Sequence, residues 1–295
     1  MILIKIKNTL WVITMAALCL MLFIVVDARA DKGTEVIFGG AEGAVIRTDD
    51  SAQVQTITTD SEVDKSDGLE WPDIDIFGTD SDTDDAESFL YSVINEDNPL
   101  SAVFDPYEKG FVEDIPSGYY TYLCKFNINA MPMLTKMIDD ARAQGFTVYV
   151  NSAYVSYSYQ EQIFNGTASG LAESMGLSTD YNDPEYQLAV EKAKTITKYP
   201  GTSEHQLGYA VDIIDGWRSG KLTYSSMNQE LFAWLDEHCA EYGFIKRYPT
   251  KKLLLTGLDE SWHYRYVGVE AATFIMENDL CLEEFYAHYD SDFTY

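Results

Sequence analysis

The sequence predicts an α+β fold for residues 89–295, and three observations support this prediction. Segments with helical periodicity are mixed with short apolar segments that lack strict alternation, which is typical of α+β domains rather than of a doubly wound sheet. The same region holds 35 of the 40 aromatic residues of the chain, which is enough to build a hydrophobic core. The sequence contains no internal repeat.

The predicted elements follow one another along this region. Four segments with apolar residues at helical spacing predict helices, and they cover residues 131–143, 186–197, 228–242 and 269–278. Gly145 and Gly243 lie just beyond the first and third of them, where a helix commonly ends. Short apolar segments predict strands over residues 146–150, 209–214 and 262–267.

The charge of the chain is strongly negative and unevenly distributed. It has 48 Asp and Glu against 20 Lys and Arg, a net charge of -28. Phosphate recognition needs a cationic surface, so this balance argues against a partner that is a nucleic acid or an anionic membrane. Half of the net charge lies in residues 31–88, which carry 17 acidic and three basic residues.

The N-terminal 30 residues have the order of an export signal. Lys5 and Lys7 precede an apolar run over residues 10–26, which is near the short limit of about 17–25 residues for a membrane span. Residues 28–30, Ala-Arg-Ala, offer a cleavage site with small residues at both ends. Residues 1–30 are therefore expected to be a signal peptide or an N-terminal membrane anchor. Either one would place the rest of the chain outside the cytoplasm.

Residues 31–88 are expected to form an acidic, disordered linker. Their low hydrophobicity and high charge cannot offset the entropy lost on ordering. Asp-rich runs such as residues 79–85 also suggest calcium loops, but they lack Gly and Glu at the positions that an EF-hand requires. A solvated spacer is the favoured interpretation.

The cysteines give little guidance. Cys19 lies in the apolar run, and the other three, Cys124, Cys239 and Cys281, show no Cys-x-x-Cys spacing. One disulfide is compatible with this number, whereas a thiolate metal site is not suggested.

Two dense motifs carry the chemistry. Residues 203–212 read Ser-Glu-His-Gln-Leu-Gly-Tyr-Ala-Val-Asp, and residues 260–263 read Glu-Ser-Trp-His. Two imidazoles and one carboxylate are a common ligand set for a catalytic zinc. On a straight strand or helix, His205 and Asp212 would be too far apart to share one ion. The chain must therefore fold back between them, and Gly208 permits such a turn.

The second motif supplies a candidate base. On a strand, His263 and Arg265 share one face, and Trp262 and the neighbouring tyrosines share the other. Zinc lowers the pKa of a bound water to about 7, so a carboxylate as close as Glu260 can take its proton at neutral pH.

These residues together predict a Zn²⁺ site. Its ligands are His205, Asp212 and His263, and Glu260 is the general base. Taken singly, such a histidine is more often a surface residue and such an aspartate a turn or cap partner. Their occurrence together with Glu-x-x-His strengthens the case for the metal site, but on spacing alone the metal site and these structural roles stay equally open.

The two motifs resemble the VanY-type D-alanyl-D-alanine carboxypeptidases, which are zinc peptidases of bacterial cell-wall metabolism. The resemblance covers roughly residues 95–287 and includes Ser-Ala-Tyr at 152–154, Tyr-Ser-Tyr-Gln at 157–160 and Tyr-Pro-Gly-Thr at 199–202. It implies a compact zinc-peptidase domain over residues 89–295, with a small antiparallel sheet that carries the ligands and with flanking helices. It further implies a monomer that removes the C-terminal D-Ala from peptidoglycan stem peptides, as a DD- or LD-carboxypeptidase, and that acts at the cell wall, either membrane-anchored or secreted.

The resemblance also assigns residues. It implies the same three ligands and the same base, and it implies substrate binding by Ser203, Gln160 and Tyr154. One departure bears on activity, because the arginine that helps to stabilise the oxyanion in such enzymes is Val155 here. Losing one such group costs on the order of 10²–10³ in rate.

This departure leaves alternatives open. Arg247 or Arg265 could replace the missing arginine. The chain could also be a weakly active or inactive peptidoglycan-binding homologue, or a wall endopeptidase of the same fold.

Overall fold

The computed structural model describes residues 35–38, 44–47, 68–76, 89–216 and 228–293. The chain divides into two units, residues 1–64 and residues 65–295. In the first unit, strand β1 (Glu35–Phe38) pairs antiparallel with β2 (Ala44–Arg47). The expected signal or anchor over residues 1–30 lies outside the described residues. In the described part of the chain, no helix has the length and apolar character needed to cross a membrane.

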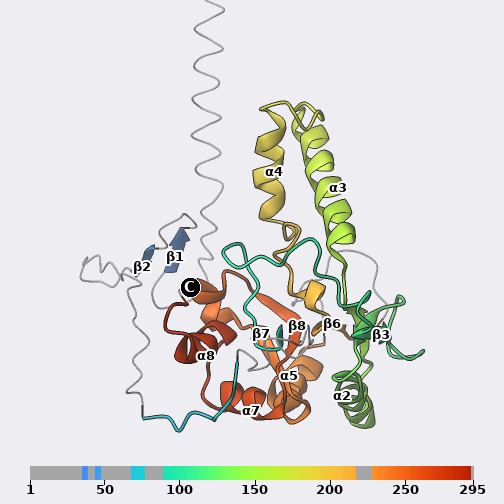
Figure 1. Cartoon of the computed structure of the whole chain (residues 1–295), viewed down its shortest axis with the longest axis vertical. Coiled ribbons are helices and arrows are strands. Elements are labelled where there is room, and N and C mark those ends of the chain that lie inside the picture. Colours follow the sequence, from blue (N-terminus) through green and yellow to red (C-terminus); the bar gives the residue numbers. More distant parts are fainter. Residues whose placement is uncertain (1–34, 39–43, 48–67, 77–88, 217–227, 294–295) are drawn as a thin grey trace, which may run out of the picture. The chain divides into compact units, whose positions relative to one another are not determined.

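A four-stranded antiparallel sheet lies at the centre of the second unit (Figure 1). Its strand order is β5-β6-β8-β7, and the strands are β5 (Tyr149–Ser152), β6 (Ala210–Ile214), β8 (Glu260–Tyr266) and β7 (Phe244–Tyr248). Strands β6 and β8 match the predicted segments closely, whereas β5 begins three residues later than expected. Strand β7 was not predicted, because its sequence Phe-Ile-Lys-Arg-Tyr looks half polar although Arg247 is fully buried.

Helices α2 (Met131–Ala143) and α5 (Gln229–His238) contribute to the main core. Helix α2 has the predicted bounds and buries the residues spaced along one face, including Leu134 and Ile138. The predicted helix over residues 228–242 divides into α5 and the 3₁₀ turn η4 (Cys239–Tyr242). Phe126 and Phe244 lie in the same core. The three described cysteines are buried and free.

Helices α7 (Val269–Glu277) and α8 (Leu282–Tyr289) form a second core with residues of β7 and the chain after β8. Residues 68–76 belong to it as well, because Ile76 is 4% exposed and the Trp71 ring stacks on His288 at 3.7 Å between centroids. Packing in this unit therefore begins on the N-terminal side of residue 89, where the catalytic domain was expected to start. Helix α8 was not among the predicted elements.

A helical hairpin of α3 (Tyr157–Met175) and α4 (Tyr186–Lys194) projects from the unit (Figure 1). The buried face of α3 consists of Gln160, Phe164, Ala168 and Ala172. Because three of these four residues are small or polar, the apolar periodicity is weak and the helix was not predicted. The Ser156 side chain caps α3 by accepting a hydrogen bond from the Tyr159 amide.

A short hairpin of β3 (Val112–Asp114) and β4 (Lys125–Asn127) packs against the turn that precedes β6. The Asn127 amide donates to the Gly208 carbonyl at 3.0 Å, and a Cβ on Gly208 would lie 2.5 Å from Val112 Cγ1. Two further short elements, η5 (Thr250–Lys252) and α6 (Leu253–Thr256), lead from β7 into β8. The observed mixture of helices and small antiparallel sheets confirms the α+β prediction.

Candidate active site

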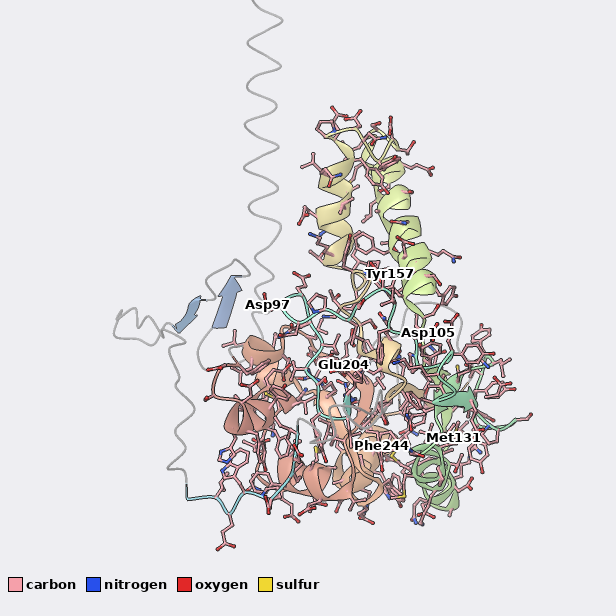
Figure 2. All side chains as sticks on the ribbon, in the orientation of Figure 1. Asp97, Asp105, Met131, Tyr157, Glu204 and Phe244 are labelled. Carbon is pink, nitrogen blue, oxygen red and sulfur yellow. The ribbon has the colours of Figure 1, made fainter. Side chains whose placement is uncertain are left out.

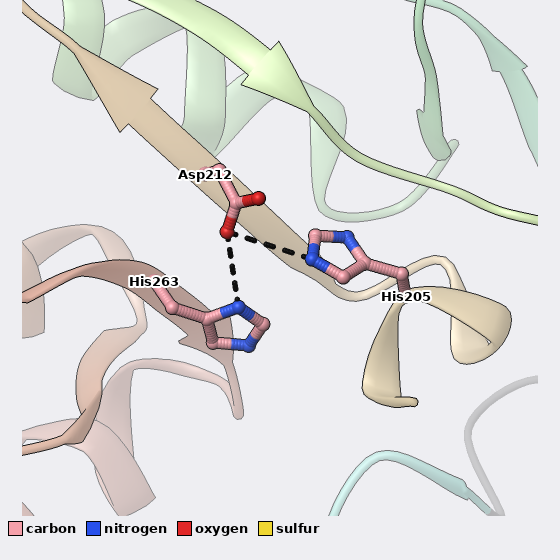
Figure 3. A group of neighbouring side chains, drawn as sticks. All are labelled: His205, Asp212 and His263. Carbon is pink, nitrogen blue, oxygen red and sulfur yellow. Dashed lines mark hydrogen bonds and ion pairs between the residues drawn. The ribbon is translucent and has the colours of Figure 1, made fainter. Parts of the chain in front are cut away.

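Three side chains that the sequence predicted as metal ligands meet at the central sheet (Figure 3). Asp212 Oδ1 lies 3.5 Å from His205 Nε2 and 3.1 Å from His263 Nδ1. The three candidate ligand atoms all lie within 4.8 Å of one another. Two imidazole nitrogens and one carboxylate oxygen so placed fit the first coordination shell of a catalytic zinc.

The local fold explains why these atoms meet. Asp212 and His263 are direct partners in the antiparallel pairing of β6 with β8, so their side chains project from the same face of the sheet. His205 comes from the 3₁₀ turn η2 (Glu204–Leu207), which ends at Gly208 with a φ of 79°. This turn reverses the chain between His205 and Asp212, as the sequence predicted.

Residues 153–155 fix the orientation of His205. The Ala153 carbonyl lies 2.6 Å from His205 Nδ1, and the Val155 amide donates to the His205 carbonyl at 3.1 Å. A ring nitrogen bonded to a carbonyl must carry the proton, so Nδ1 is the donor and Nε2 offers its lone pair to the site.

The buried carboxylate of Glu204 fixes the orientation of the His263 ring in a similar way. Glu204 Oε2 lies 3.4 Å from His263 Nε2, while Glu204 Oε1 accepts a hydrogen bond from Arg247 Nε at 2.7 Å. Arg247 in turn donates two hydrogen bonds to Glu283, at 2.9 and 2.6 Å. Figure 2 places Glu204 inside the unit, beneath the foot of the α3–α4 hairpin. The chain therefore holds Nδ1 of His263 toward Asp212.

Two carboxylates beside the imidazoles are held in the ionised form. Burial favours the protonated form of Glu204, but the positive charges of Arg247 and Arg265 hold its pKa well below the usual range. Burial acts likewise on Asp212, and the neighbouring His205 and His263 hold its pKa low. Although burial opposes the charge on His263, its bonds to Asp212 and Glu204 raise its pKa to about 9. Two carboxylates around these imidazoles favour a bound cation.

Glu260 is the first residue of β8 and lines the same pocket as the three candidate ligands. Its Oε2 lies 3.8 Å from His263 Nδ1, and a third of its side chain is exposed to solvent. A carboxylate in this place is near the metal position and can exchange a proton with a substrate bound in the pocket.

The expected substrate-binding residues divide into two groups. Ser203 and Gln160 line the pocket, and the Gln160 amide nitrogen donates to the Lys198 carbonyl at 2.7 Å. Tyr154 is not among the pocket-lining residues. Its hydroxyl is engaged by Asp105 at 2.6 Å.

Neither arginine proposed as a replacement for the missing one faces the pocket. Arg247 is held by Glu204 and Glu283, and Arg265 donates to the backbone carbonyls of residues 89 and 90 at 3.1 and 2.9 Å. Both side chains are fully buried, and neither lines the pocket, whereas Val155 does. The pocket as described therefore gives no support to the alternative that one of them takes the place of the missing arginine.

Two residues at this site were not found by sequence reasoning. Glu204 lay inside the first motif without an assigned role, because its partners Arg247 and His263 are distant along the chain. Lys198 lines the pocket, but no local pattern marks it.

The fold and the site define the class of this protein as a zinc peptidase. Known proteins are consistent with this class: the model of the VanY family, D-alanyl-D-alanine carboxypeptidase, matches residues 124–269. A D-alanyl-D-alanine carboxypeptidase of Enterococcus faecalis is 36% identical over 218 residues, which are 72% of this chain and 72% of that protein. The chain belongs to the VanY family of D-alanyl-D-alanine carboxypeptidases.

Solved structures resemble this one. The vancomycin resistance D,D-pentapeptidase VanY, crystallised as a point mutant in complex with Zn(II), is 36% identical with a TM-score of 0.51, over 67% of this chain and 99% of the other. The LD-carboxypeptidase LdcB is 29% identical with a TM-score of 0.56, over 68% of this chain and 86% of the other. A further structure shows VanYB with D-alanine-D-alanine, at 36% identity and a TM-score of 0.52, over 67% of this chain and 97% of the other.

Proposed function

We propose that this chain removes the C-terminal D-Ala from peptidoglycan stem peptides as a zinc-dependent DD- or LD-carboxypeptidase. The observation that carries the proposal is the pocket in which Glu260 and Ser203 meet His205, Asp212 and His263. Membership of the VanY family supports the substrate class, since related structures are a D,D-pentapeptidase and an LD-carboxypeptidase.

Glu260 is the proposed proton carrier. Its carboxylate accepts a proton from the water that attacks the scissile carbonyl carbon, and a C–O bond forms. When the C–N bond breaks, the same group returns the proton to the amine of the departing D-Ala. Zinc held by His205, Asp212 and His263 would supply Lewis-acid polarisation of that carbonyl.

Ser203 and Gln160 are the proposed peptide-orienting residues. Both side chains are buried and line the pocket. A hydrogen bond between either of them and a substrate is therefore shielded from bulk water. Because the Gln160 nitrogen already donates to Lys198, its oxygen is the atom assigned to a substrate N–H.

The chain is also proposed to be exported. The basic residues before the apolar run of residues 10–26 support this, and peptidoglycan lies outside the cytoplasm. Of the acidic linker expected over residues 31–88, residues 31–64 precede the second unit in the sequence and would act as a spacer between an anchor and the enzyme. Sequencing the N-terminus of protein from fractionated cells tests this. A start after Ala30 indicates a cleaved signal, an intact start in the membrane fraction indicates an anchor, and intact protein in the cytoplasm refutes export.

The enzymatic test uses the purified full chain with zinc. Peptides ending in D-Ala-D-Ala or in L-Lys-D-Ala are incubated with it and the products are weighed by mass spectrometry. We expect loss of one D-Ala from at least one peptide, and Glu260→Gln is expected to abolish the loss while zinc stays bound. Glu237→Gln, an exposed substitution of the same kind on α5, is the matched control. Zinc-bound wild-type protein that releases no D-Ala from either peptide would contradict the proposal.

A further inference from the structure

Besides any role in catalysis, a positive group in the pocket is needed to recognise the end of the substrate chain. A carboxypeptidase must distinguish the last residue of a chain from an internal one, and the distinguishing feature is the free α-carboxylate. Binding a carboxylate in a partly buried site requires a donor of opposite charge. Arg247 and Arg265 are engaged in the interior, and Val155 is apolar.

Among the described residues that line this pocket, Lys198 alone is a lysine or an arginine. It follows α4, at the foot of the hairpin, and shares the pocket with Glu260 and Trp262. Among the described residues, Lys198 forms no ion pair, whereas the neighbouring Lys194 is bound to Glu191 at 2.9 Å. A positive charge is therefore present in the pocket and available to a ligand.

The backbone around Lys198 is held from two sides. Gln160, on the first turn of α3, donates to the Lys198 carbonyl at 2.7 Å. Three residues further on, Gly201 accepts a hydrogen bond from the Leu100 amide at 2.7 Å. Gly201 has a φ of 88°, and a Cβ there would lie 2.7 Å from the Leu100 carbonyl oxygen. Such fixed attachment reduces the entropy lost when the lysine engages a ligand.

The charge environment of Lys198 points to the leaving-group side of the pocket. Burial lowers the pKa of Lys198, and among the charges that act in the opposite direction Glu260 is the strongest, ahead of Glu204. Glu260 is the group that returns a proton to the amine of the departing residue. In an α-amino acid only one carbon separates that amine from the carboxylate, so a group that binds the carboxylate must lie near Glu260.

We propose that Lys198 binds the α-carboxylate of the C-terminal residue of the substrate, and so makes the enzyme specific for chain ends. This inference rests on the proposed function for the identity of the substrate. It separates a carboxypeptidase from an endopeptidase of the same fold, because an internal peptide bond offers no carboxylate to the lysine. It also assigns the Lys198 ammonium group to substrate binding rather than to stabilisation of the oxyanion.

The test compares a peptide ending in L-Lys-D-Ala-D-Ala with the same peptide as its C-terminal amide. Rates of hydrolysis are measured with the zinc-loaded full chain, and affinities are measured by calorimetry with Glu260→Gln, which binds without turnover. Lys198→Met removes the charge, Lys198→Arg keeps it, and Lys192→Met, an exposed substitution on α4, is the matched control. Zinc content and thermal unfolding confirm that each variant is folded.

We expect Lys198→Met to lower kcat/KM and affinity for the free acid by about 10- to 100-fold, the usual effect of losing a hydrogen bond to a charged group. For the amide, both quantities should change less than about twofold, and Lys198→Arg should recover part of the preference. Equal losses on acid and amide, or no loss on the acid, would overturn the inference.

The two proposals fail in different ways. In one case the wild type releases no D-Ala, but Glu260→Gln binds the free-acid peptide more tightly than its amide and loses this preference when Lys198 is replaced. The carboxylate site then stands and the proposed reaction fails. If Glu260→Gln binds acid and amide equally, or binds neither, the carboxylate site is refuted whatever the activity of the wild type.

Discussion

Replacing Glu204 by glutamine tests how the buried carboxylate controls the metal site. Glu204 uses one oxygen for Arg247 Nε at 2.7 Å and the other for His263 Nε2 at 3.4 Å. Glutamine has the same shape but only one oxygen, so one of these two donors must face its NH₂ group. Arg247 cannot give up its proton, whereas His263 can move its proton from Nε2 to Nδ1. That tautomer blocks the nitrogen that faces Asp212.

Two magnitudes follow from these contacts. An outer hydrogen-bond partner of a metal ligand typically contributes 10- to 100-fold to metal affinity, so we expect Glu204→Gln to weaken zinc binding by about that factor. Breaking a buried ion pair costs about 3–5 kcal/mol. Because Arg247 keeps both hydrogen bonds to Glu283, we expect a loss of unfolding free energy near the lower end, about 3 kcal/mol.

The assay measures zinc affinity by competition with a chelator and stability by denaturant unfolding of the metal-free protein. Glu283→Gln is the control, since it also removes a carboxylate from Arg247 but forms no hydrogen bond to His263. It should cost comparable stability and leave zinc affinity within about twofold. Unchanged zinc affinity in Glu204→Gln would refute the tautomer argument. An equal loss of affinity in both variants would show that general destabilisation is the cause.

Three further predictions concern the frame of the pocket. Gly208→Ala should destabilise the protein by at least about 2 kcal/mol in denaturant unfolding, because of its φ of 79° and the 2.5 Å approach to Val112; a smaller loss would mean that the turn adjusts freely. Val155→Arg should raise kcat about tenfold or more in the D-Ala release assay, by adding a cation to the pocket; an unchanged rate would show that the oxyanion needs no further charge. Tyr154→Phe should cost about 1 kcal/mol of unfolding free energy and leave KM within about twofold, because its hydroxyl bonds Asp105; a large rise in KM would restore it as a substrate contact.

The sequence by itself determined the candidate ligands and the local geometry that serves them. His205, Asp212 and His263 were identifiable because the chemistry of zinc restricts which side chains bind it. The reversal at Gly208 followed from the distance that any regular structure would impose between His205 and Asp212. Helix α2 was predictable because its apolar residues repeat at helical spacing.

Only the tertiary structure decided which charges serve the site and which stabilise the interior. Arg247 and Arg265 look like ordinary polar residues in the sequence, but both are fully buried, and partners far away along the chain hold them. Lys198, which has no distinctive neighbours in the sequence, lines the pocket. The physical reason is that the effect of a charge depends on burial and on its partners in space. Both are set by the pairing of β6 with β8 and by the packing of α3 and α8, which no local pattern encodes.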